Sequence, residues 1–271
     1  MNPAPTSPTS AVFTAPLSAT GATPLVSVIR ALLLLRLRAL LGPKLALRFA
    51  AIGAGLIAVT FLAVPHGNAE SFRQWSLEVF VLKIVPLLCL VAGGSALRDE
   101  IRSFTIEYLW TRPASKTHLV VGAYVGTVVL MFAQVMAFLV LIHLVGAIRG
   151  IPQVWIHLPV AAGAALGGIL AFCALALALG VFSGKYMILG IQYGVLVELG
   201  LSRLPSRVNL ISVTHHVQTL IESAASGDIA PSVLHLLSGA AGCLVIAAIG
   251  VVLAALIFTT TNYRIGDEKE S

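Results

Sequence analysis

The sequence predicts an all-α, polytopic membrane protein with six transmembrane helices, a cytoplasmic interfacial helix before them and a short cytoplasmic helix after the second. Composition is the first observation behind this prediction. Of the 271 residues, 58% are hydrophobic and 10% are charged, and the mean hydropathy is +0.97. Soluble domains carry about 25% charged residues. The chain therefore has more apolar surface than one aqueous core could bury.

The second observation is a series of apolar stretches, each close to the ~20 residues that cross a bilayer as a helix. Lipid offers no hydrogen-bond partner to an unpaired backbone, so each stretch is expected to be helical. The six predicted spans are 45–65, 77–97, 119–147, 159–183, 186–202 and 233–259.

The distribution of Lys and Arg is the third observation, and it predicts the orientation. With the N-terminus in the cytoplasm, twelve of the 17 Lys and Arg residues fall in inside segments, four fall outside and Lys83 lies within a span. Positive residues collect on the cytoplasmic side. Both termini are therefore predicted to lie in the cytoplasm, and the net charge of +6 is expected to face anionic lipid rather than nucleic acid.

The two ends of the chain are predicted to be tails. Residues 1–23 are rich in Pro, Ser and Thr without Lys or Arg, which favours disorder. Residues 24–41 carry three arginines among leucines and are interpreted as an interfacial helix, with a seventh span as the alternative. The domain of six spans covers 24–265, and 266–271 form a cytoplasmic C-terminal tail.

The segment 98–113, RDEIRSFTIEYLWTRP, differs from the rest of the chain in its density of charge. Asp99 and Glu100 would stand in the first turn of a helix, where carboxylates favour the helix dipole. Pro113 disfavours helix at the residue before it. Ile101, Phe104, Thr105, Tyr108 and Leu109 recur at helical spacing and would form one apolar stripe. The mixed charges favour a protein partner, although a solvated face remains open.

These residues resemble a motif of the permease subunits of type-2 ATP-binding cassette (ABC) exporters, E-x-E-x-G-T-L-E-x-L-L-x-x-P-x-S-[RK]. Glu100, Thr105, Glu107 and Pro113 match its acids, threonine and proline, and Ile106, Leu109, Ser115 and Lys116 match further positions. Arg102 stands in place of an acid and Phe104 in place of the glycine, which puts a tight bend there in doubt. The segment VNLISVTHHVQTLIES before the last span resembles the family as well, so the similarity covers about 25–265.

The resemblance implies that 98–113 is a coupling helix that docks on a cytoplasmic ABC ATPase. Two permease subunits, as a homo- or heterodimer, and two ATPase copies would form an exporter in the inner (plasma) membrane. ATP and Mg would bind the partner, and this chain would hold no cofactor. The residues expected to contact the ATPase are Asp99, Glu100, Arg102, Phe104, Glu107, Tyr108 and Arg112.

The sequence is consistent with an energy source on another chain, because it contains no G-x-x-x-x-G-K-[ST] phosphate loop. GVFSGK at 180–185 is one residue short and is followed by Tyr186. The chain is therefore expected not to be an enzyme. The runner-up interpretation is a structural or assembly membrane protein that docks a partner other than an ATPase, and a membrane-embedded enzyme is a third.

Polar residues at membrane depth are candidates for a substrate pathway, which in the family runs between spans two and five. Intramembrane charges are costly and usually face a cavity or each other. The candidates are Lys83, Glu198, Gln192 and His143. Lys83 and Glu198 are expected in the outer third of their spans, either as a pair or as separate charges. The alternatives are snorkelling to the headgroups for the two charges, and interhelical hydrogen bonds for Gln192 and His143.

Two further patterns have structural rather than chemical interpretations. His215 and His216 are adjacent, so on a helix they point about 100° apart and rarely share a metal ion. Residues 213–224 instead predict an amphipathic outer helix that rests on the bilayer or caps the pathway. Three cysteines lie inside apolar runs and are expected to pack as small apolar residues, with no thiolate metal site.

Overall fold

A computed structural model describes residues 43–102, 115–200, 207–225 and 229–261, and these residues form helices and connecting turns without a β-strand. The predicted tails, the 24–41 helix and residues 103–114 lie outside the described residues. In chain order the elements are α2 (Pro43–Ala63), α3 (Ala69–Arg73), η1 (Gln74–Ile84), α4 (Val85–Arg102), α6 (Lys116–Ile148), η2 (Val154–Ile156), α7 (His157–Phe182), α8 (Tyr186–Tyr193), η3 (Gly194–Gly200), η5 (Arg207–Ile211), α9 (Val213–Ala225) and α10 (Ile229–Thr260).

Four helical stretches of the described chain are long and apolar enough to cross a bilayer: Ala69–Arg98, Lys116–Ile148, Val154–Phe182 and Val233–Thr260. Two shorter apolar helices, Phe49–Ala63 and Tyr186–Glu198, correspond to the predicted first and fifth spans. The all-helical, multi-pass architecture is therefore confirmed, with four clear candidate spans. The prediction of six full spans goes beyond what helix length supports.

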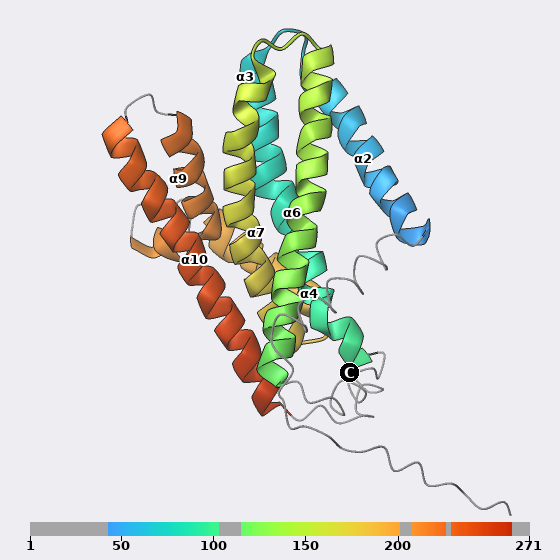
Figure 1. The fold of residues 1–271 in the computed structure, drawn as a ribbon, viewed down its shortest axis with the longest axis vertical. Helices are drawn as coiled ribbons and strands as arrows, with labels where there is room; N and C mark the ends of the chain where they lie inside the picture. The colour runs from blue at the N-terminus through green and yellow to red at the C-terminus, as the bar shows by residue number, and fades with distance from the viewer. Residues whose placement is uncertain (1–42, 103–114, 201–206, 226–228, 262–271) are drawn as a thin grey trace, which may run out of the picture.

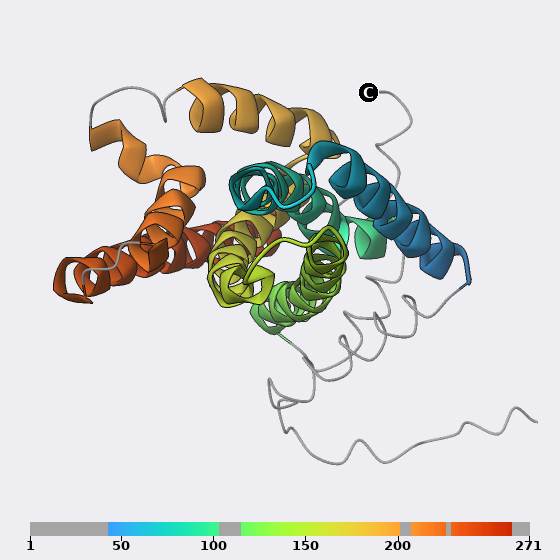
Figure 2. The ribbon, with the colours of Figure 1, turned by 90° about the horizontal axis from the view of Figure 1, so that it is seen from above.

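The helix α7 lies at the centre of the bundle. It packs along α4 on one side, α10 on another and α6 on a third, while α2 contacts the bundle through α6 (Figure 1). Seen from above, α2 lies on the flank opposite α9 and α10 (Figure 2). The core consequently follows α7, which has buried alanines and glycines from Ala161 to Gly180.

Small residues on α7 and α4 bring the two backbones into contact. A Cβ added at Gly93 would lie 2.9 Å from the carbonyl oxygen of Cys173 and 2.8 Å from Cβ of Ala176. Lipid tails are as apolar as the side chains, so the hydrophobic effect does not drive helices together in a membrane. They associate instead through van der Waals contacts at such close approaches. Gly93 is therefore a packing residue between α4 and α7.

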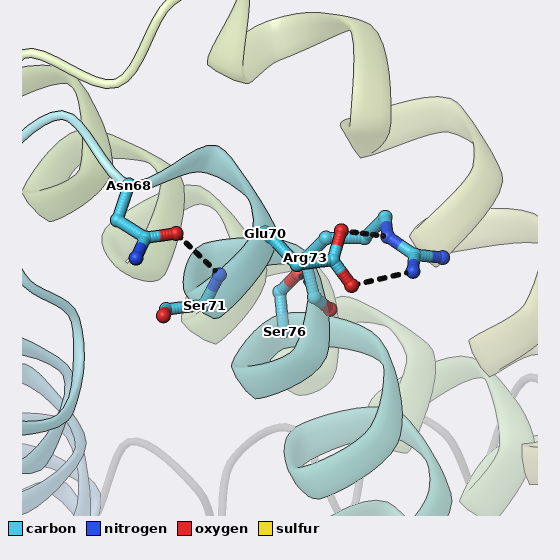
Figure 3. A network of polar contacts seen from close by, with 5 residues as sticks. All are labelled: Asn68, Glu70, Ser71, Arg73 and Ser76. Carbon is cyan, nitrogen blue, oxygen red and sulfur yellow. Dashed lines mark hydrogen bonds and ion pairs between the residues drawn. The ribbon is translucent and has the colours of Figure 1, made fainter.

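The second predicted span differs most from the structure in its length. It was predicted over 77–97, but the helix runs without a break from Ala69 through Arg102 as α3, η1 and α4. Asn68 caps its start by accepting a hydrogen bond from the Ser71 backbone N–H at 3.0 Å (Figure 3). The first residues of the predicted coupling helix thus continue α4 rather than beginning a separate helix, because nothing in SALRDEIR breaks a helix.

The middle of this long helix is π-helical. Across η1 the backbone hydrogen bonds join residues five apart, as in the bond from the Val85 N–H to the Phe80 carbonyl. Pro86 follows two residues after the end of η1. It has no N–H to donate, and in an α-helix its ring would clash with the carbonyl group four residues earlier. A π-helical turn before a proline is one way to relieve this conflict. The fifth span ends in a second π-helix, η3.

The predicted amphipathic helix at 213–224 is confirmed as α9. Its side chains at Val213, Val217, Leu220 and Ile221 are buried, as the periodicity predicted. The helix packs against α10 and α7, and Figure 1 shows it alongside one half of α10. It therefore packs against the bundle; of the two predicted arrangements, resting on the bilayer or capping the pathway, its contacts with α7 and α10 favour the second.

Candidate functional site

A cavity of about 690 Å³ opens between the second and fifth apolar helices. Its walls come from η1 and α4 on one side, α8 and η3 on the other, α7 at the back and α9 at one end. Most of the lining is hydrocarbon. The apolar lining residues are Leu77, Leu82, Pro86, Leu87, Leu90, Phe172, Leu175, Ala176, Leu179, Ile191, Val195 and Ile221.

Charged side chains also line this cavity, and two of them are predicted pathway residues, Lys83 and Glu198. The structure therefore places both in one cavity. No ion pair joins them within the described part of the chain, where the salt bridge present is Glu70–Arg73. The other charged lining residues are Arg73, Glu78 and Glu222.

The π-helix η1 aligns three of these charges. Residues five apart in an α-helix point about 140° away from each other. In a π-helix they are joined by successive backbone hydrogen bonds and lie one above the other. Arg73, Glu78 and Lys83 are spaced by five, and all three line the cavity. The π-helical backbone thus produces a row of alternating charge that α-helical periodicity does not predict.

At one end of this row, Arg73 is paired with Glu70 of the preceding turn. The Arg73 Nη2 atom lies 2.7 Å from Oε1 of Glu70 and Nε lies 3.1 Å from Oε2, so the contact is bidentate (Figure 3). Both side chains are well exposed. The pair marks the end of the molecule where α2 joins α3, which we call the α3 end.

Lys83 lies near the middle of its helix, fourteen residues after Ala69 and fifteen before Arg98. The sequence placed it in the outer third, because the predicted span began at residue 77. The structure starts the helix eight residues earlier, and this moves Lys83 away from either end. Snorkelling to a headgroup, the alternative interpretation, would require a reach of about 20 Å at 1.5 Å per residue.

Glu198 is 9% exposed and its carboxylate accepts at least four hydrogen bonds. Oε1 accepts from the Tyr193 hydroxyl at 2.9 Å and from the Val213 N–H at 3.0 Å. Oε2 accepts from the Ser212 hydroxyl at 2.7 Å and from the Thr214 N–H at 2.9 Å. The carboxylate therefore caps the N-terminus of α9, where the helix dipole favours negative charge.

This arrangement depends on the second π-helix. Tyr193 and Glu198 are five residues apart, and η3 brings the hydroxyl and the carboxylate together. Sequence reasoning identified Glu198 but missed Tyr193 and Ser212 as its partners. The spacing of five could have indicated the pair only if the π-helix had been anticipated.

The remaining predicted pathway residues lie elsewhere. Gln192 is exposed beside the cavity lining and does not belong to it. His143 is fully buried on α6 near the α3 end, where its Nδ1 lies 2.8 Å from the Leu139 carbonyl oxygen. Its ring meets Phe72 edge to face at 5.1 Å and lies 6.0 Å from the ring of Trp155. The local environment of His143 is thus a packing contact between α6, α3 and η2.

The opposite end of the cavity wall approaches the predicted coupling segment. Arg98, the first residue of that segment, is 7% exposed, and a Cβ at Gly184 would lie 2.6 Å from its Nη2. Gly184 belongs to the turn between α7 and α8. The backbones of Asp99, Glu100 and Arg102 continue α4, and Phe104, Glu107, Tyr108 and Arg112 lie outside the described residues.

Comparison with known protein families identifies this architecture. The model of the family described as ABC-2 family transporter protein matches residues 43–197, more than half of the chain. The match runs from the start of α2 to the residue before Glu198, and it includes the predicted coupling segment. Among curated proteins, no match was found.

Proposed function

The chain belongs to the ABC-2 family of transporter proteins and is a permease component of an ABC transporter, and from this premise we propose that it forms the substrate pathway of an ATP-driven exporter. Two copies, or one copy with a related permease, would enclose the pathway. Two cytoplasmic ATPase subunits would bind ATP and Mg and drive it. The cavity between the second and fifth apolar helices supports this proposal most directly.

The proposed topology follows the predicted charge distribution. The shorter helices α2 and α8–η3 would cross the bilayer together with the four longer ones, giving six spans with both termini in the cytoplasm of the inner membrane. The bias of Lys and Arg toward the ends at 98–118 and 183–185 supports this orientation. The α3 end would then face outward.

The proposed coupling route starts at residues 98–113. Because α4 carries the first residues of this segment without a break, a push on the segment would act directly on α4. The close packing of Arg98 on the turn at Gly184 would pass the same displacement to α8. Both walls of the cavity, α4–η1 and α8–η3, are thus connected to the ATPase-facing end.

The test is capture of the full chain from its native membranes in mild detergent, with mass spectrometry of the proteins that accompany it. We expect a P-loop ATPase in equal amount, and we expect it to be lost in Glu107→Arg, because the reversed charge would repel a basic group of the partner that pairs with the Glu107 carboxylate. The control is Glu268→Arg, an acid of the C-terminal tail predicted on the same side, which should retain the ATPase. Capture without any ATPase would contradict the proposal and favour an assembly protein with another partner.

A further inference from the structure

The ammonium group of Lys83 is a charge in an apolar wall. On its own helix the cavity side is formed by Leu82, Pro86 and Leu87, and α7 contributes Phe172 and Leu175 across the cavity. No hydrogen bond or ion pair of Lys83 occurs with the described residues. A cation at such a depth is costly unless an anion or water compensates it.

Three acids line the same cavity, Glu78, Glu198 and Glu222. Glu198 holds the start of α9 through hydrogen bonds to both carboxylate oxygens. Glu78 stands between Arg73 and Lys83 in the row, with a basic residue on either side. Glu222 comes from α9, which forms one end of the cavity. Of the two bases that line the cavity, Arg73 is paired with Glu70, so Lys83 is the one whose ammonium group has no ion pair with a described residue.

We propose that this cavity binds amphipathic anions, with an oxyanion group of the ligand at the Lys83 ammonium and its hydrocarbon body against the walls of α4, α7 and η3. The ammonium has three N–H donors and no acceptor, which suits phosphate or carboxylate oxygens. The leucine and phenylalanine side chains suit an alkyl chain. That the ligand is cargo rests on the proposed function, whereas the binding itself does not.

An amphipathic cation would fit this site poorly. Its charged group would meet the Lys83 ammonium, the Glu198 carboxylate of the same cavity already accepts hydrogen bonds within the protein, and Glu78 lies between the two positive charges of Arg73 and Lys83. An uncharged alkyl chain would leave the ammonium without compensation. The charge of the ligand is thus the property that discriminates, and it can be tested with probes that share one tail.

The experiment measures binding of three twelve-carbon probes to the full chain in phosphatidylcholine nanodiscs: dodecyl phosphate, dodecanol and dodecyltrimethylammonium. We expect dodecyl phosphate to bind at least tenfold more tightly than the other two. In Lys83→Met, which keeps the length of the side chain without its charge, this preference should vanish. It should survive in Lys83→Arg and in the control Lys185→Met, a lysine on the α7–α8 turn outside the cavity lining.

Equal binding of the three probes to the wild type, or an unchanged preference in Lys83→Met, would overturn the proposal. Loss of thermal stability in Lys83→Met together with normal binding preference would make Lys83 a structural residue. Inorganic phosphate should not compete, because it lacks the apolar body. Replacing part of the phosphatidylcholine with phosphatidylglycerol distinguishes the sources: competition identifies a lipid headgroup as the oxyanion, and unchanged binding identifies a ligand from solution.

The two proposals fail separately. If an ATPase accompanies the chain but the probes do not discriminate, the exporter remains and the anion site is wrong. If the probes discriminate through Lys83 but no ATPase is found, the site remains and its role as an exporter pathway is wrong.

Discussion

The backbone of Gly180 on α7 lies in direct contact with the backbone of Gly94 on α4. A Cβ added at Gly180 would overlap the Gly94 carbonyl oxygen, and the facing atoms are main chain rather than a flexible side chain. Where α7 and α4 cross, at the back and side of the cavity, there is therefore no space for even one added methyl group.

We predict that Gly180→Ala separates α4 from α7 and lowers the melting temperature of the purified protein. Overpacking of a tight contact typically costs about 1–3 kcal/mol. The matched control is Gly163→Ala on the same helix, where an added Cβ meets nothing within 4 Å. That variant should be neutral or slightly stabilising, since alanine favours helix. Equal melting temperatures for the two variants would contradict the close crossing.

Glu198→Gln should loosen α9 while leaving the rest of the bundle folded. The amide keeps one acceptor oxygen and presents an NH₂ group in place of the other, so the N–H of either Val213 or Thr214 loses its acceptor. Losing charge-assisted bonds at a helix N-terminus costs about 1–3 kcal/mol. Hydrogen exchange followed by mass spectrometry should show faster exchange over 213–225.

The control for this prediction is Glu222→Gln, an exposed acid near the other end of the same helix. Its exchange pattern should match the wild type. If α9 exchanges equally in both variants, the carboxylate of Glu198 does not hold this helix and is available for another role.

Arg149 should tether α2 to the bundle at the α3 end. Its guanidinium lies 3.7 Å from the centre of the Phe61 ring, contacts the Phe61 carbonyl oxygen and lies 2.7 Å from Nδ1 of His66. Because α2 otherwise packs mainly on α6, Arg149→Ala is expected to make the α2–α3 connection more susceptible to proteolysis. Arg73→Ala removes only an exposed ion pair, worth about 1 kcal/mol or less, and should leave that connection as resistant as in the wild type.

The native cysteines should not react with thiol reagents while the protein is folded. Cys89, Cys173 and Cys243 are free and at most 1% exposed, and a buried thiol is protected from modification. We expect no labelling by a membrane-permeant maleimide until the protein is denatured. Single cysteines placed at Leu62 and at Phe182, both strongly exposed, would then react and serve as positive controls. Rapid labelling of the wild type would show that the core opens.

Hydropathy was sufficient to predict the helical, multi-pass class and the approximate place of the long apolar helices. It misjudged the second helix, because Asn68, Glu70 and Arg73 are polar and were read as loop, although they cap and extend the helix. Apolar periodicity also predicted the buried face of α9. The mean hydropathy of a sequence window measures the free energy of transferring its side chains from water to lipid. It contains no information about helix caps or about ion pairs that form within one turn.

The site was only partly predictable. Lys83 and Glu198 stood out because charge is rare at membrane depth. Their placement in one cavity depends on tertiary packing, and the partners of Glu198 depend on a backbone form that no residue pattern in 194–200 signals. Glu78 was overlooked, since α-helical geometry assigns it to a different face from Lys83.

The two π-helices have a consequence for comparing this chain with its relatives. A π-helical segment holds at least one more residue than the α-helix that would cover the same length. A relative whose corresponding helix is α-helical throughout will therefore need a gap within 74–84 or 194–200 to be aligned correctly. An ungapped alignment would match Lys83 or Glu198 to a residue on a different face of the relative's helix. Variation at these two charges can then be judged only after the length of each helix has been settled.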